Sequence, residues 1–163
     1  MPERQDADID GFGEPPEWFN SRVHEIWHYW NIKRGDRRAP DRADLDPVLE
    51  IPSLVSGVWL LDVVDGGTRF RYRLIGDDLH AAGVVARTGE YLDEQPTARN
   101  SVRTLAGLLK SVETATPYWR CGQPTLLHDQ YIAGLEFIGL PLTVGNGRIN
   151  MLLNYTYFTR QRA

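Results

Sequence analysis

Residues 58–75 decide the fold, and they read VWLLDVVDGGTRFRYRLI. The first seven residues of this stretch are mostly β-branched or apolar, and residues 68–75 alternate between polar and apolar types. Between the two runs, Asp65, Gly66 and Gly67 supply a turn whose residues accept positive φ angles. Two strand-like runs joined by such a turn predict a β-hairpin.

The second strand of this hairpin has two chemically different faces. Side chains alternate between the two faces of a strand, so its apolar residues share one side and its arginines share the other. The alternation points Phe70, Tyr72 and Leu74 toward the covering helices, and Arg69, Arg71 and Arg73 away from them. The sequence therefore predicts a sheet with one apolar face and one cationic face.

The segment before the hairpin predicts a helix and a linker. Large apolar residues recur at helical spacing, as they do along one side of an amphipathic helix. They are Phe19, Val23, Ile26, Trp27 and Trp30. The following stretch, 34–47, is rich in arginine and aspartate and has no period, which indicates an ordered linker. We expect a mobile tail at residues 1–16, the helix and linker at 17–53, and a globular domain at 54–160.

The segment after the hairpin predicts helices and then three strands. A short helix is expected at 77–83, and Thr97 caps a longer helix that ends at Pro117. Strands are expected at 118–127, 132–142 and 148–158, with Gly145-Asn146-Gly147 as the turn between the last two. A five-stranded antiparallel sheet covered by helices on one face would bury these patterns, so the fold class is α+β.

Composition and charge exclude several classes of protein. The chain has 163 residues, of which 42% are hydrophobic and 25% are charged, as in one soluble globular domain. No apolar run approaches the ~20 residues of a membrane-spanning helix, and the acidic start does not resemble a secretory signal. The single cysteine, Cys121, suits a reducing cytoplasm. The net charge of −4 argues against a nucleic-acid binder.

Five short motifs follow one another in register along the chain. They are Tyr29-Trp30 leading to Arg34, PDRADLDP at residues 40–47, FRYRLIG at 70–76, Thr88-Gly89, and Leu140-Pro141-Leu142 before Asn146-Gly147. Together with the element order they resemble the PAS-like family of short, often single-domain alphaproteobacterial proteins. The resemblance covers about residues 18–158, and it implies a sensory or protein-interaction fold, often without recognised catalytic residues.

The resemblance also directs attention to cofactors, because PAS-like domains commonly enclose one between sheet and helices. A haem-binding PAS domain of the oxygen-sensor type takes an axial histidine from the long helix, but residues 98–116 contain neither histidine nor cysteine. A flavin photosensor carries its cysteine in Asn-Cys-Arg-Phe, whereas Cys121 lies in Arg-Cys-Gly-Gln. We therefore expect neither haem nor flavin, and assign no cofactor. The candidate ligand-binding residues are Tyr72, Leu74, His80, Leu105, Leu109 and Phe137. For His80, partial exposure on a helix is the preferred interpretation and the pocket is the alternative.

Residues 24–28 match the H-E-x-x-H pattern on a predicted helix. A four-residue step puts His24 and His28 on one face, where they could bind zinc with Glu25 as a base. A zinc protease also needs a third ligand and a substrate-aligning sheet, and almost nothing precedes this helix. We expect surface histidines and no zinc.

The arginines admit two interpretations. Guanidinium groups match phosphate geometry, so the arginines of the second strand and linker could bind a phosphate-bearing ligand such as a nucleotide second messenger. The same residues stand among aspartates, and salt bridges that seat the linker on the sheet would explain them without a ligand. The second interpretation is preferred. The linker arginines in question are Arg34, Arg37, Arg38 and Arg42.

The functional prediction is a non-enzymatic sensory or adaptor module that binds a small ligand, a signalling partner protein, or both. The aromatic stripe of the first helix is a candidate interface, because large apolar patches need cover. Either the opposite face of the sheet or the same helix of a second subunit in a homodimer would supply it, and both arrangements can coexist. The alternative is a cone-shaped enzyme like the ketosteroid isomerases, with an apolar pocket and a base or donor among Asp78, His80, Tyr118 and His128. Strand order discriminates the two, because a PAS sheet places the first hairpin beside the last strand.

Overall fold

The computed structural model describes residues 8–95, 101–123 and 132–160. Within these residues, six strands form one antiparallel sheet, in the spatial order β1-β4-β5-β6-β2-β3. The helices are α1 (Ser21–Arg34), α2 (Pro47–Glu50), α3 (Asp77–Ala81) and α4 (Ser101–Thr114). The strands are β1 (Ile9–Phe12), β2 (Val58–Val64), β3 (Arg69–Ile75), β4 (Tyr118–Gly122), β5 (Ile132–Thr143) and β6 (Ile149–Arg160).

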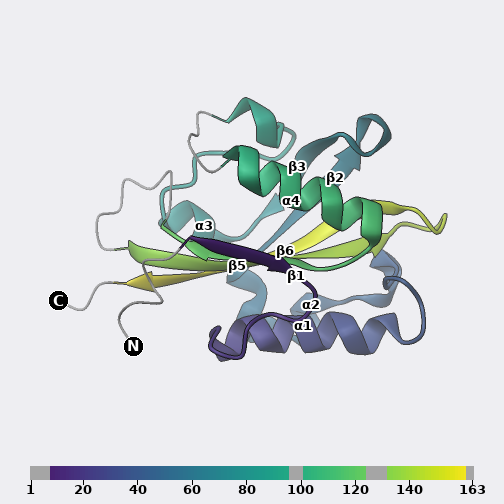
Figure 1. The fold of residues 1–163 in the computed structure, drawn as a ribbon, viewed down its shortest axis with the longest axis horizontal. Helices are drawn as coiled ribbons and strands as arrows, with labels where there is room; N and C mark the ends of the chain where they lie inside the picture. Colours follow the sequence, from purple (N-terminus) through teal and green to yellow (C-terminus); the bar gives the residue numbers. More distant parts are fainter. Residues whose placement is uncertain (1–7, 96–100, 124–131, 161–163) are drawn as a thin grey trace.

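The strand order is the one expected of a PAS domain. The β2–β3 hairpin lies beside the last strand, because β2 pairs with β6 as well as with β3. The α4 helix, which connects β3 to β4 along the chain, covers the sheet between them (Figure 1). This order confirms the α+β PAS-like prediction, and it is the order that the PAS interpretation expected.

In the part of the chain that the structure describes, the sheet has one strand more than the five expected. Ile9–Phe12 lie in the segment expected to be a mobile tail, yet they form β1 and pair in register with β4. Arg103 of α4 fixes this strand with two hydrogen bonds to the Asp10 carboxylate, at 2.7 and 3.0 Å. Four residues are too few to carry a strand pattern of their own, so the pairing depends on a partner strand more than 100 residues away.

Helices cover both faces of the sheet. The amino-terminal helix α1 lies on one face, and α3 and α4 lie on the other (Figure 1). Each face has its own hydrophobic core: the α1-face core includes Ile26, Leu140 and Leu153, and the α4-face core includes Phe70, Leu108 and Leu152. Because both faces are covered, side chains that point to either face of the sheet are buried. This explains the nearly continuous apolar runs of β2 and β6.

The aromatic stripe of α1 packs against the sheet of its own chain. Asn20 caps the helix by accepting a hydrogen bond from the Arg22 amide at 3.0 Å. Of the stripe residues, Phe19, Val23, Ile26 and Trp30 are buried, and Trp27 is half-buried. The sheet therefore supplies the cover that the stripe requires, and its burial removes the argument that a second copy must cover these interface candidates.

A β-bulge changes which residues of β3 face the helices. Leu61 pairs with Tyr72 but Leu60 pairs with Leu74, so Arg73 is an extra residue. Phe70 and Tyr72 lie in the α4-face core as predicted. Leu74 does not: it is 43% exposed on the opposite face of the sheet. The period-two prediction was wrong at this residue because the bulge shifts the alternation by one position.

Candidate functional site

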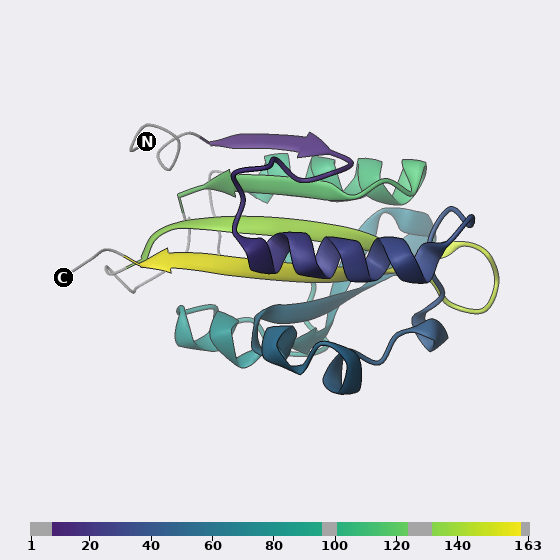
Figure 2. The same cartoon turned by 90° about the horizontal axis from the view of Figure 1, so that it is seen from below.

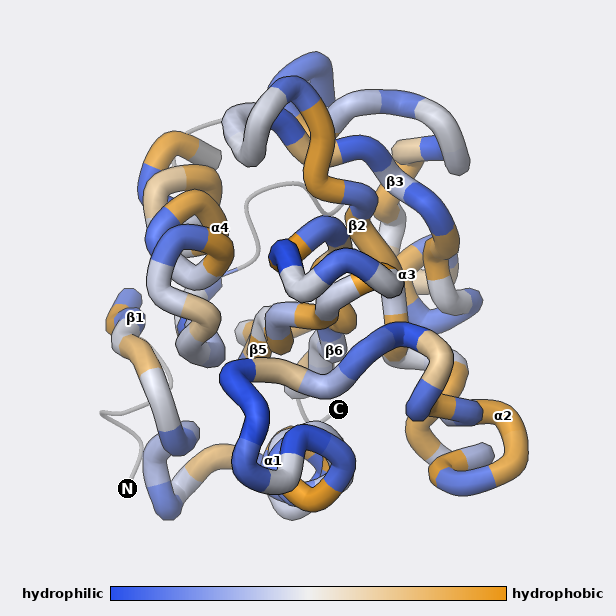
Figure 3. Tube along the Cα trace, turned by 90° about the vertical axis from the view of Figure 1, so that its right-hand side faces the viewer, coloured by the Kyte–Doolittle hydropathy of each residue, from blue (hydrophilic) through white to orange (hydrophobic). Residues whose placement is uncertain are grey.

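The α1 helix covers only part of its sheet face. It packs against β5 and β6 and runs along them (Figure 2). Seen from the side, α1 and α4 lie on opposite sides of these central strands, and β2 and β3 extend beyond the reach of α1 (Figure 3). At the start of β2, Ile51 and Leu54 share a buried core with Val58 and Leu60, so the chain leaves open only the remaining part of the α1 face that the β2–β3 hairpin forms.

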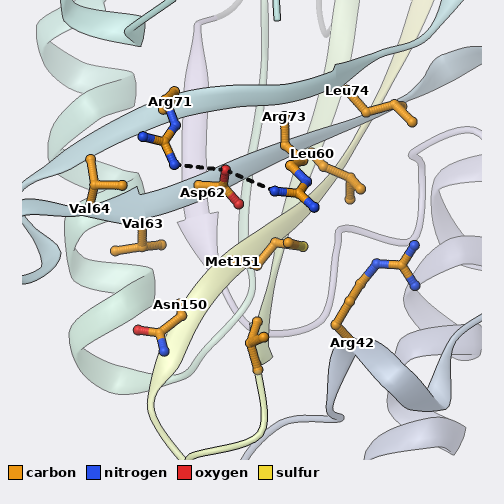
Figure 4. A pocket seen from close by; sticks show the side chains of 11 residues that line it. Arg42, Leu60, Asp62, Val63, Val64, Arg71, Arg73, Leu74, Asn150 and Met151 are labelled. Carbon is orange, nitrogen blue, oxygen red and sulfur yellow. Dashed lines mark hydrogen bonds and ion pairs between the residues drawn. The ribbon is translucent and has the colours of Figure 1, made fainter. Parts of the chain in front are cut away.

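This open part is a groove of about 630 Å³, which we call the β2–β3 groove. Its lining comes from the linker, the hairpin and the end of the β5–β6 hairpin (Figure 4). The lining residues are Arg42, Leu60, Asp62, Val63, Val64, Arg71, Arg73, Leu74, Val144, Asn150 and Met151. The volume lies within the range of about 300–1,000 Å³ that is typical of ligand sites.

Two arginines of β3 share one carboxylate in the groove. Asp62 Oδ2 lies 3.4 Å from an Arg71 nitrogen and 3.9 Å from an Arg73 nitrogen. Figure 4 shows both guanidinium groups pointing toward Asp62, with Arg42 across the groove. The side chains of Arg71 and Arg73 are 40% and 63% exposed. Long ion pairs at such exposure contribute at most about 1 kcal/mol, so both guanidinium groups remain accessible to a further anion.

The groove also presents apolar side chains to solvent. Leu74 and Val144 are each 43% exposed, and they come from different hairpins. Leu60 and Met151 lie beneath them, at 7% and 6% exposure. The groove therefore combines an apolar floor and apolar edges with cationic groups.

Arg69 of β3 and Arg37 of the linker are bound locally, in a pattern that differs from the predicted seating of the linker. Arg69 is held by Asp93 and Glu94, at 3.0 Å each, and lies over the Tyr91 ring. Arg37 pairs with Asp44 inside the linker at 2.8 Å.

The linker is seated on the sheet by a carboxylate. Asp41 Oδ2 accepts hydrogen bonds from the Thr143 hydroxyl at 3.0 Å and from the Gly145 amide at 2.7 Å. These hydrogen bonds lower the pKa of Asp41 below its ordinary value, with the Gly145 amide as the largest cause. This contact holds the neighbouring Arg42 at the edge of the groove. Arg42 itself donates to the Leu45 carbonyl at 3.0 Å.

The predicted pocket residues are only partly brought together. Tyr72 and Phe137 are buried in the α4-face core, and Leu105 and Leu109 of α4 pack against them. Two candidates lie elsewhere: Leu74 faces the groove, and His80 is exposed, with Nδ1 3.1 Å from the Val84 carbonyl oxygen.

The α4-face core is filled largely by aromatic rings. Trp59 lies 5.9 Å from Tyr72 and 5.6 Å from Phe137, measured between ring centroids. Tyr118 lies 6.0 Å from Phe137, measured between ring centroids. The Tyr118 ring also lies so close to Gly107 of α4 that a Cβ atom at residue 107 would clash with it. Burial raises the pKa of Tyr72 well above its ordinary value, so its hydroxyl stays protonated.

One polar group in this core was missed by the sequence reasoning. Asn154 of β6 is fully buried, and its Oδ1 atom has no hydrogen-bond partner among the described residues. It lies beside Gly139, close to Leu108 and Phe137. A buried unsatisfied acceptor costs about 1–3 kcal/mol, and in folded proteins such a group often has a water or ligand partner. A polar residue amid an apolar strand was the signal available in the sequence.

The residues of the H-E-x-x-H motif do not form a cluster with further ligands. His24 Nε2 lies 2.9 Å from the Pro16 carbonyl oxygen, and His28 is exposed beside the Trp27 ring. Across residues 8–95, 101–123 and 132–160, no three histidine, cysteine, aspartate or glutamate side chains group closely enough to hold a metal ion.

The candidate groups of the enzyme alternative lie in separate places. Asp78 accepts a hydrogen bond from the Ser56 hydroxyl at 2.9 Å, and the Tyr118 hydroxyl donates to Asp10 at 2.9 Å. His80 is exposed, and His128 lies outside the described residues. The described candidates thus share no site.

Comparison with known proteins gives a family match. A family model described as PAS domain matches residues 19–106, which is more than half of the chain. No match was found among curated proteins or among solved structures. Within the part of the chain that the structure describes, every helix is too short or too polar to span a membrane.

Proposed function

Because the chain belongs to the PAS domain family, whose members are sensory and signalling modules, we propose that it is a non-enzymatic adaptor that binds a signalling partner at the β2–β3 groove. The observation that carries this proposal is the incomplete cover of the α1 face. The groove is concave, and it places exposed Leu74 and Val144 beside exposed Arg73 and half-buried Arg71. Arginine and methionine are enriched at protein interfaces, and exposed apolar groups beside them are typical of contact surfaces.

The groove is also well placed to transmit a signal. Arg42 belongs to the linker between α1 and α2, and Asp41 ties that linker to the β5–β6 turn. A partner in the groove would touch the linker, the hairpin and the turn together. Binding that favours one arrangement of these segments shifts the population toward it, and α1 follows because the linker continues from it.

A pair of apolar-to-aspartate variants tests the adaptor function. Leu74→Asp places a charge in the groove, whereas Val102→Asp places the same charge on α4, where Val102 is 75% exposed on the other face. The partner that co-purifies with the wild-type protein from its native cells is expected to be lost with Leu74→Asp and kept with Val102→Asp. The affinity is then measured with the purified partner. Equal retention by both variants would contradict the proposal.

A second candidate function is small-molecule sensing within the α4-face core, and the unsatisfied Asn154 oxygen favours it. The ligand would be a small, largely apolar molecule with one hydrogen-bond donor for Asn154. Trp59 and Phe137 would pack against it. Thr156 adds a polar group nearby, since its hydroxyl accepts a hydrogen bond from the Trp59 indole at 3.0 Å.

Native mass spectrometry of freshly purified protein tests this second function. We expect a bound small molecule in the wild-type protein and its loss in Asn154→Leu, which removes the buried acceptor but preserves side-chain bulk. A wild-type mass equal to that of the bare chain would contradict ligand sensing at this site, without affecting the groove.

A further inference from the structure

The chemistry of the groove identifies the class of partner. Resting on the adaptor function above, we infer that the β2–β3 groove binds a short acidic segment of another protein, one that also carries leucine-like apolar side chains. The carboxylates meet Arg73, Arg71 and Arg42, and the apolar side chains cover Leu74 and Val144.

The charge of the groove supports an acidic occupant. Three guanidinium groups line it, and Asp62 is the single carboxylate among the described residues of the lining. The groove is therefore locally positive in a chain whose net charge is −4. Asp62 is 15% exposed at its side chain and Arg73 is 63% exposed, so the cationic group is the more accessible of the pair. Complementary charge at such a rim selects the partner and raises its association rate.

The same lining disfavours a free phosphate. The Asp62 carboxylate lies between the two β3 guanidinium groups and would repel a phosphate dianion from the position that both could reach. Six of the eleven lining residues are apolar, and a free phosphate has no group to place on them. A peptide offers single carboxylates at the rim and apolar side chains for the floor.

The β1 strand of a second copy is a poor occupant. Its acidic side chains are already committed within the chain: Asp10 binds Arg103 at 2.7 Å, and Asp8 binds Arg120 at 3.0 Å. Offering them to a groove would leave Arg120, which is buried, without its carboxylate. A separate acidic partner incurs no such cost.

Amide chemical shifts of the full chain, recorded by two-dimensional NMR, provide the test. The probes are three ten-residue peptides in which leucine alternates with glutamate, glutamine or lysine. At 50 mM salt we expect the glutamate peptide to shift the amides of residues 71–74, 144 and 150, and to bind at least tenfold more tightly than the other two peptides. Raising the salt to 500 mM should weaken its binding several-fold.

Variants of the most exposed arginine sharpen the test. Arg73→Glu should weaken binding of the glutamate peptide at least tenfold, and Arg73→Lys should restore most of it. Lys110→Gln serves as the control, because Lys110 is an exposed cation on α4 at the opposite face. An unchanged amide spectrum away from residue 73 shows that each variant is folded.

Several results would overturn the inference. They are a glutamate peptide that shifts no groove amide at 1 mM, equal binding of the three peptides, an affinity that Arg73→Glu leaves unchanged, or binding to phosphatidylglycerol vesicles in place of the peptide. If one of these results is found and Leu74→Asp still abolishes binding of the native partner, the adaptor function stands and only the acidic chemistry of the partner is wrong.

Discussion

Replacing Trp30 with alanine is expected to destabilise the protein by about 3–5 kcal/mol, the usual cost of removing a large buried aromatic side chain. Trp30 is 3% exposed in the α1-face core, and its indole Nε1 donates to the Pro141 carbonyl at 2.7 Å. The variant removes the ring and leaves that carbonyl without its donor. A urea titration followed by far-ultraviolet circular dichroism measures the change in the free energy of unfolding.

Trp18 provides the matched control, because it is the same residue type at 37% exposure, just before α1. Trp18→Ala should change the free energy of unfolding by less than about 1 kcal/mol, as substitutions at exposed sites usually do. Equal losses in the two variants would mean that α1 does not pack on the sheet as described, and the groove beside it would then have no defined edge.

The sequence predicted those parts of the fold whose patterns are local. The stripe from Phe19 to Trp30 identified α1 and its buried face, because helical spacing alone determines which side chains line up. The alternation in β3 correctly placed Phe70 and Tyr72 in the core. The element order then indicated the PAS-like sheet. Each element was identified from a short window of sequence, and only their order needed the whole chain.

The groove could not be predicted, because it depends on pairing between distant segments. Its residues come from the linker, the β2–β3 hairpin and the β5–β6 hairpin, and no single motif connects these three regions. The bulge at Arg73 is equally hidden: it follows from the pairing of Leu60 with Leu74, which the sequence of β3 alone does not determine. The cationic side of β3 was predicted, but not that a leucine would join it.

The positions of the candidate pocket residues were also predicted correctly in part and wrongly in part. Tyr72, Leu105, Leu109 and Phe137 were selected by apolar pattern and do lie on one core. His80 was selected because histidine is chemically versatile, and the structure leaves it exposed. The chemistry of a residue type does not show where its side chain lies in the fold, whereas an apolar pattern predicts which side chains are buried together.

A second large effect is expected at Gly76, which lies between β3 and α3. Its φ angle is −67°, so any residue could adopt its backbone conformation. The constraint is space: a Cβ atom there would lie 2.3 Å from the Ser56 carbonyl oxygen and 2.5 Å from that of Val58. Both neighbours are backbone atoms, one in the turn just before β2 and one in the first residue of β2, and they cannot rotate out of the way as a side-chain end could.

Gly76→Ala should therefore destabilise the protein by about 3 kcal/mol, at the upper end of the usual cost of overpacking, because β2 and β3 must separate at this end. Gly66 in the hairpin turn is the contrast, since it has φ +69° and open space around it. Gly66→Ala meets backbone strain alone and should cost about 1–2 kcal/mol. Urea titration of both variants ranks the two costs. A smaller loss at Gly76 than at Gly66 would show that the two segments are not in close contact, and the end of the hairpin that carries Leu74 would then be free to move.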